Sequence, residues 1–129
     1  MSRDLNLLHS AFRPKVDAFI AAVQAAGIDM LVTCGWRSND EQTALYAQGR
    51  TTPGHIVTNA KAGQSAHNYG LAVDVVPLIN GKCCWDDKDP TWQQIGAIGQ
   101  SCGMVWYGAP GAVFPETPHF QMPDWENFK

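Results

Sequence analysis

The sequence predicts an α+β domain in which a small antiparallel sheet carries flanking helices. Apolar residues recur at helical spacing in separate segments, and short apolar runs typical of strands lie between them. Helices do not separate the successive strands regularly, which disfavours a doubly wound parallel sheet. A length of 129 residues suits one core. We therefore expect residues 1–129 to form a single domain.

Two helices and one strand are expected in the first part of the chain. Residues 12–27 place their apolar side chains at helical spacing, which predicts an amphipathic helix. The apolar run DMLVTCGW, residues 29–36, is suited to a buried strand. Ser38 and Glu41 then form the S-x-x-E pattern of a capping box, so a helix should begin directly after Ser38.

The second half is expected to contain most of the sheet. Residues 50–64 are rich in Gly, Thr, Pro and Asn and predict a long loop, a length that is often functional in a compact domain. The later elements are expected to begin with a strand at residues 70–78 and a helix with two glycines at residues 89–104. Two short strands are expected after them, at residues 105–108 and 119–122.

Composition excludes several functional classes. The net charge of −3 and the pI near 5.7 give no basic surface for nucleic acid or an anionic membrane. No apolar run reaches the length of a membrane span, and the polar start predicts synthesis in the cytoplasm without a signal peptide. The four cysteines are too few for a disulfide scaffold. We expect Cys34 and Cys102 to pack as small buried residues, and Cys83 or Cys84 to be exposed in a polar turn.

The stretch SAHNYGLAVD, residues 65–74, places a histidine and an aspartate around a turn-forming sequence. On one continuous strand, His67 and Asp74 would lie about 23 Å apart. A bend at Asn68-Tyr69-Gly70 would bring the two side chains to one point. The structural alternative is a hydrogen-bonded pair with no ligand.

A second histidine makes a metal site the stronger interpretation. His67, Asp74 and His119 form a donor set that zinc accepts with one position left for water. Glu116, three residues before His119, would then act as the general base on that water. Two alternatives are a solvated loop carboxylate at Glu116 and a non-haem iron site made by the three donors.

Three motifs, taken together, resemble those of the D-Ala-D-Ala peptidase and hedgehog-fold metallopeptidase family. They are GWRSNDEQ, residues 35–42, with Arg37 and Gln42; S-x-H-x-x-G-x-A-x-D, with Ser65, His67 and Asp74; and Glu116-x-x-His119. Their order along the chain is that of the family, and they span most of the sequence. The resemblance implies one zinc ion per chain.

The last motif resembles one subgroup within this family. Its D,D-carboxypeptidases usually place Trp before the final zinc histidine, whereas this chain has Pro118. Pro118 and the segment GMVWYGA, residues 103–109, are similar to the L-alanyl-D-glutamate endopeptidases of phage endolysins and their bacterial relatives. Many of those enzymes carry Asp where this chain has Glu116, and both residues can transfer the proton.

The resemblance implies a role for each matching residue. His67, Asp74 and His119 would hold zinc, Glu116 would activate the zinc-bound water, and Arg37 would stabilise the oxyanion. Four residues are candidate substrate contacts, each with a structural alternative: Ser65 supporting His67, Gln42 bracing Arg37, and Trp106 and Tyr107 packing in the core.

The implied activity is hydrolysis of the L-Ala–D-Glu bond in the stem peptide of peptidoglycan. The resemblance further implies a monomer without a separate cell-wall-binding domain, released to the periplasm by a partner such as a holin. One alternative is a D-Ala-D-Ala carboxypeptidase or dipeptidase, which Pro118 disfavours. Another is a non-catalytic zinc module that binds the cell wall, which would need neither Glu116 nor Arg37.

Overall fold

Five antiparallel strands form the centre of the molecule. The computed structural model describes residues 2–109 and 116–129. The strands are β1 (Met30–Cys34), β2 (Ala72–Ile79), β3 (Lys82–Cys83), β4 (Val105–Trp106) and β5 (His119–Gln121). Their order is β1-β2-β5-β4, and β3 pairs with the far end of β2. The predicted α+β class, with a small antiparallel sheet, is confirmed.

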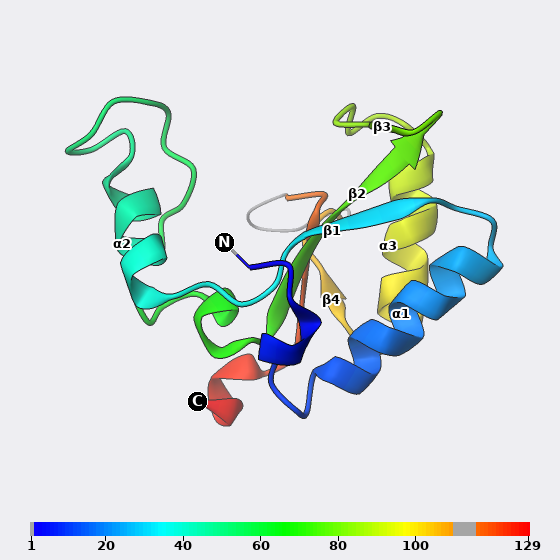
Figure 1. Cartoon of the computed structure of the whole chain (residues 1–129), viewed down its shortest axis with the longest axis horizontal. Coiled ribbons are helices and arrows are strands. Elements are labelled where there is room, and N and C mark those ends of the chain that lie inside the picture. The colour runs from blue at the N-terminus through cyan, green and yellow to red at the C-terminus, as the bar shows by residue number, and fades with distance from the viewer. Residues whose placement is uncertain (1, 110–115) are drawn as a thin grey trace.

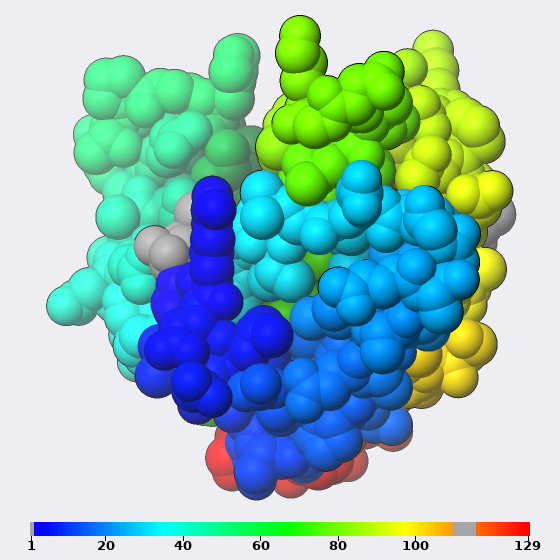
Figure 2. Space-filling view, turned by 45° about the vertical axis from the view of Figure 1, so that its right-hand side comes forward, coloured from blue at the N-terminus to red at the C-terminus, as the bar shows by residue number. Residues whose placement is uncertain are grey.

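The helices lie on opposite sides of the molecule. They are α1 (Arg13–Ala25), α2 (Asn39–Ala47) and α3 (Thr91–Ser101), with short 3-10 turns η1 (Leu5–Leu7), η2 (Ala66–Tyr69) and η3 (Trp125–Phe128). Helices α1 and α3 pack together beside the sheet, whereas α2 and the loop after it lie apart (Figure 1). In the space-filling view, this α2 segment and the β2–β3 end project separately from the body (Figure 2). Among the described residues, no helix combines the length and apolar character that a membrane crossing requires.

Local signals in the sequence explain where the helices begin. Helix α1 has Pro14 in its first turn, where the missing N–H costs nothing. The capping box of α2 is present: the Ser38 hydroxyl accepts from the Glu41 N–H at 3.1 Å, and the Glu41 carboxylate accepts from the Ser38 N–H at 3.2 Å. The loop that follows α2 contains no further helix or strand, as predicted.

The two faces of the sheet have different functions. Val73 and Val75 on β2 are completely buried in the main core, and Asp74 between them points to the opposite face. Asp74 is paired with Cys34 on β1 and with His119 on β5. Directly paired residues extend to the same face of a sheet. The register therefore aligns these three side chains in one row across the face away from the core.

The two glycines of α3 allow the helix to touch the sheet. A Cβ atom at Gly96 would collide with the ring of Trp106, and one at Gly99 would collide with the ring of Phe120. Both aromatic side chains belong to the core. The predicted helix is therefore present although glycine has a low helix propensity. Glycine is needed at both positions because no larger side chain would fit against the two rings.

The β2–β3 hairpin departs from the sequence prediction, which gave only a polar turn here. Asn80 and Gly81 have φ angles of 53° and 77°, as expected for the two central residues of a tight hairpin turn. Ile79 pairs with Lys82 across this turn. Asn-Gly is itself a strong hairpin signal, so the sequence contained the information that the prediction missed.

Replacing Gly99 by Ala should destabilise the protein by about 1–3 kcal/mol, the usual cost of overpacking a core. This result runs against helix propensity, which favours Ala by about 1 kcal/mol. Denaturant unfolding would measure the change, with Gln100→Ala on the exposed side of α3 as the control. Equal stability of Gly99→Ala and the unmodified protein would contradict the proposed contact with Phe120.

Candidate active site

A short turn brings the first histidine to the aspartate. The Ser65 hydroxyl caps η2 by accepting from the His67 N–H at 3.3 Å. Gly70 ends η2 with a φ of 69°, a conformation that favours glycine. The chain then enters β2, and His67 Nε2 lies 3.3 Å from Asp74 Oδ2. The predicted bend is confirmed, and the Ser65 hydroxyl supports the turn that carries His67.

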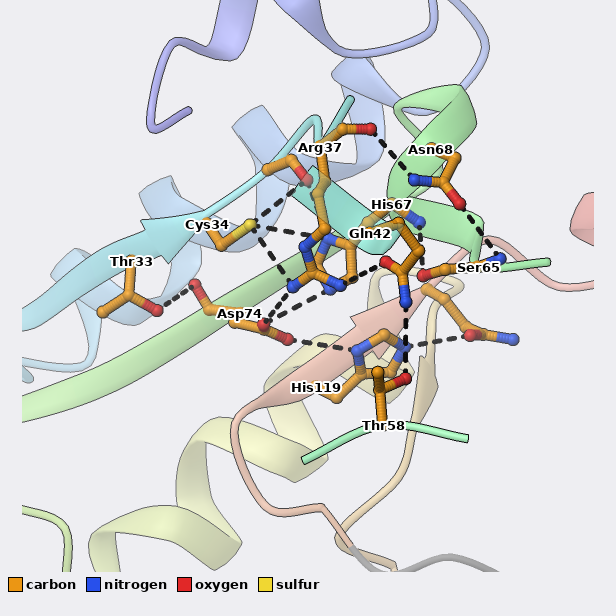
Figure 3. Close-up of polar contacts among 12 residues, drawn as sticks. Thr33, Cys34, Arg37, Gln42, Thr58, Ser65, His67, Asn68, Asp74 and His119 are labelled. Atoms are coloured by element: carbon orange, nitrogen blue, oxygen red, sulfur yellow. Dashed lines mark hydrogen bonds and ion pairs between the residues drawn. The ribbon is translucent and has the colours of Figure 1, made fainter. Parts of the chain in front are cut away.

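The second histidine approaches Asp74 from the neighbouring strand. His119 Nδ1 lies 3.1 Å from Asp74 Oδ1, and the two imidazole rings are 5.1 Å apart between centroids. Figure 3 shows both rings directed toward the carboxylate from η2 and β5. The structure therefore brings together the three side chains that the sequence singled out as metal donors.

Hydrogen bonds on the outer side of each ring fix its orientation. His67 Nδ1 is 2.7 Å from the Gly35 carbonyl, and His119 Nε2 is 2.9 Å from Gln121 Oε1. Both partners are acceptors, so both outer nitrogens carry a proton. In the neutral imidazoles, each inner nitrogen then keeps its lone pair on the Asp74 side, as a metal ligand requires. On a tetrahedral ion with bonds of about 2.0–2.1 Å, neighbouring donor atoms lie roughly 3.3 Å apart, which is close to the two histidine–carboxylate spacings of 3.3 and 3.1 Å.

The pKa shifts of His67 and Asp74 show that this site favours positive charge beside the carboxylate. Burial lowers the pKa of His67 and raises that of Asp74, because it disfavours both charged forms. The attraction between the two groups is stronger. It raises the pKa of His67 to about 9 and holds the pKa of Asp74 well below its usual range. A partly buried carboxylate that keeps its charge is stabilised by a cation beside it, here protonated His67, Arg37 or a bound metal ion.

Arg37 enters the same site from the segment between β1 and α2. Its Nη2 lies 3.9 Å from Asp74 Oδ2, and its Nη1 donates to Gln42 Oε1 at 2.9 Å. Its buried Nε has no hydrogen-bond partner among the residues that the structure describes. Gln42 is completely buried, and its amide donates to the Ala60 carbonyl at 2.8 Å. Of the two roles considered for Gln42, this geometry favours the brace for Arg37.

Asn68 is a supporting residue that the sequence interpretation used only as a turn former. Its amide nitrogen donates to the Arg37 carbonyl at 3.0 Å. Its oxygen accepts from the N–H groups of Gly63 and Ser65 at 3.1 and 3.3 Å. It therefore connects the long loop, the η2 turn and the Arg37 segment. The tendency of Asn to bond local backbone was the available signal.

Cys34 is a second residue whose position was missed. It is buried as predicted, but its neighbours are polar: its Sγ lies 3.9 Å from His67 Nδ1 and 3.8 Å from Arg37 Nη2. Cys34, His67 and Asp74 offer donor atoms that all lie within 4.8 Å of one another. The His67 nitrogen that contacts the thiol is already bonded to the Gly35 carbonyl. The thiol thus contacts the outer side of that ring.

Glu116 and the two aromatic candidates lie at the β4–β5 edge. Glu116 is exposed; its N–H donates to the Tyr107 carbonyl at 3.0 Å, and its carbonyl accepts from the His119 N–H at 3.1 Å. The Tyr107 ring is 4.6 Å from the His119 ring. Burial raises the pKa of Tyr107, and the charge of Glu116 raises it further. Trp106 instead packs in the core, so for this residue the geometry favours the structural alternative.

Comparisons with known proteins agree with this geometry. The family profile described as VanY, D-alanyl-D-alanine carboxypeptidase, matches residues 5–106, a range that includes Arg37, His67 and Asp74. The chain belongs to this peptidase family. Over 123 residues it is 38% identical to the peptidoglycan L-alanyl-D-glutamate endopeptidase CwlK of Bacillus subtilis, covering 89% of this chain and 73% of that protein. The predictions of the family and of a peptidase are confirmed.

Solved structures of similar proteins share the fold. The L-Ala D-Glu endopeptidase ChiX of Serratia marcescens superposes with a TM-score of 0.66 at 24% identity, covering 96% of this chain and 86% of that one. The D,D-pentapeptidase VanY of a VanB-type vancomycin-resistance cassette, solved in complex with Zn(II), gives a TM-score of 0.66 at 17% identity. That match covers 92% of this chain and 74% of the other.

The metal-stripped protein should lose stability as the pH rises from 6.5 to about 9. Over this interval the folded chain keeps the proton on His67 and the unfolded chain releases it, so the stabilisation present below pH 6.5 is lost. The expected loss is on the order of 2 kcal/mol, measured by urea unfolding at several pH values. Asp74→Asn should flatten this dependence, and His55→Gln, at an exposed histidine, should preserve it. An unchanged slope in Asp74→Asn would contradict the pairing.

Proposed function

We propose that this chain is a zinc-dependent endopeptidase that cleaves the L-Ala–D-Glu bond of the peptidoglycan stem peptide. The observation that carries the proposal is its 38% identity to an endopeptidase named for that bond. Zinc is supported by the donor set and its spacing, and by the presence of Zn(II) in a structure of the same fold. Pro118 before His119 also supports this bond, through the resemblance to the endopeptidase subgroup.

In this proposal, His67, Asp74 and His119 hold the zinc ion and leave one position open. Zinc supplies Lewis-acid chemistry, polarising a carbonyl oxygen and making water more acidic. Glu116 accepts the proton of the attacking water and passes it to the leaving amine. Its backbone bonds to Tyr107 and His119 keep it beside the donor set, and its exposed side chain is accessible to water and substrate.

Arg37 is assigned to the oxygen of the scissile carbonyl. The Arg37 guanidinium lies beside the donor set, with Nη2 3.9 Å from Asp74 Oδ2, so it can donate to an oxyanion that develops there. Gln42 fixes Nη1, so the guanidinium is oriented before substrate arrives. This role requires a planar donor set, which lysine does not reproduce.

A second candidate function is carboxypeptidase activity on a terminal D-Ala-D-Ala. The family profile that matches this chain carries that description, which is the observation in its favour. The two activities differ in the bond cleaved and therefore in the products. A carboxypeptidase releases one free D-alanine from the end of a pentapeptide, whereas the proposed endopeptidase separates the L-alanine from the rest of the stem.

The proposed setting is the bacterial cell wall. The substrate is the stem peptide, the partner for release is a holin-type protein, and the enzyme acts as a monomer in the periplasm. No nucleic acid takes part, which agrees with the net charge of −3.

Digestion of purified muropeptides should give fragments with a new D-Glu amino terminus and a new L-Ala carboxyl terminus. Mass spectrometry of the products identifies the bond because the two candidate cleavages leave different masses. Release of D-alanine alone would assign the carboxypeptidase function instead. A zinc-loaded, folded chain that cleaves neither bond would favour a module that only binds the wall.

Changing Glu116 to Gln should lower turnover by roughly 100-fold or more, the range expected for losing a positioned general base. Zinc content and unfolding temperature should change little, because the residue does not contact the donor set through its side chain in this arrangement. Glu126→Gln, at another exposed glutamate, is the matched control and should keep full activity. Loss of zinc in Glu116→Gln would make Glu116 a ligand, and full activity would place the base elsewhere.

A further inference from the structure

Gln121 occupies the position from which the orientation of His119 is controlled. It lies two residues after His119 on β5, so both side chains extend from the same face of the strand. Gln121 Oε1 lies 2.9 Å from His119 Nε2. An amide oxygen only accepts hydrogen bonds, so this contact requires the proton of the imidazole to be on Nε2.

That proton position is the one a metal donor needs. A neutral imidazole carries one proton, and the nitrogen without it is the ligand. With the proton on Nε2, the lone pair is on Nδ1, which faces Asp74 at 3.1 Å. If the Gln121 amide were reversed, its NH₂ group would face Nε2 and favour the opposite tautomer, with the lone pair directed away from Asp74.

The two histidines differ in how securely this proton is held. His67 donates to the backbone carbonyl of Gly35, which cannot be exchanged for a donor by a side-chain rotation. His119 depends on an amide with two possible orientations. The orientation in the structure is the one with Oε1 toward Nε2.

We propose that Gln121 is a positioning residue of the metal centre, holding His119 with Nδ1 toward Asp74. Hydrogen bonds to the outer nitrogen of a metal-binding histidine set its tautomer and typically change metal affinity 10–100-fold. The inference rests on the proposed metal centre and is independent of which peptide bond is cleaved.

Zinc affinity of the full-length chain, measured by competition with a chelator, provides the first test. Gln121→Leu should bind zinc about 10–100-fold more weakly, since no acceptor remains for the Nε2 proton. Gln121→Glu should bind at least as tightly as the unmodified chain, because both carboxylate oxygens accept. Gln100→Leu, the same change at an exposed glutamine of α3, is the control and should have no effect. Nitrogen NMR of neutral His119 in the zinc-free protein should show the proton on Nε2, and a mixture of tautomers in Gln121→Leu.

Gln121→Glu decides the proposal if Gln121→Leu does not fold. It keeps the length and polarity of the side chain and offers only acceptors. Weaker zinc binding by Gln121→Glu than by the unmodified chain would overturn the positioning role.

The outcomes separate this inference from the proposed function. Unchanged zinc affinity and an unchanged His119 spectrum in Gln121→Leu would overturn the positioning role alone. Weak binding by Gln121→Glu, similar to that of Gln121→Leu, would overturn it as well. An unmodified chain that binds no zinc would overturn the metal centre and this inference together, whereas a different cleaved bond would leave the inference intact.

Discussion

The attraction between the partly buried carboxylate of Asp74 and the two imidazoles depends on almost every feature of the fold. The carboxylate is on the middle strand of the sheet, so one neighbour can reach it by strand pairing and another by a tight turn. His119 uses the first route and His67 the second. The strand-pairing route does not tolerate a register slip of one residue, because that slip would turn the His119 side chain to the core face. Packing of the core on one face of β2 thus determines which side chains meet on the other face.

The parts of the structure that sequence could predict are those encoded locally. The capping box at Ser38 and the turn at Gly70 each depend on neighbouring residues, and both were predicted correctly. Contacts made through strand pairing were not predictable in this way. Cys34 lies beside His67, and Gln121 beside His119, as a result of register and side-chain packing, which a single sequence does not specify. The burial of Trp106 in the core was unpredictable for the same reason.

The α2 segment and its loop are held to the rest of the site by polar contacts more than by a core. Gln42 bonds the loop at Ala60 from the buried side. Arg50 bonds the carbonyls of Tyr46 and Thr58 at 2.7 and 3.0 Å from the exposed side. Few buried apolar side chains contribute in this region. Segments held in this way open at a lower free energy than a packed core, so the loop can adjust while the donor set stays rigid.

The three residues of β5 alternate between the site and the core. His119 and Gln121 face the site, and Phe120 between them fills the core against α3. For protein engineering, this arrangement means that thermostabilising changes around Phe120 also move the two residues on either side of it. Sequence diversification, affinity tags or fused modules are better accommodated at the Asn80-Gly81 turn, which projects from the body at the far end of β2 (Figure 2).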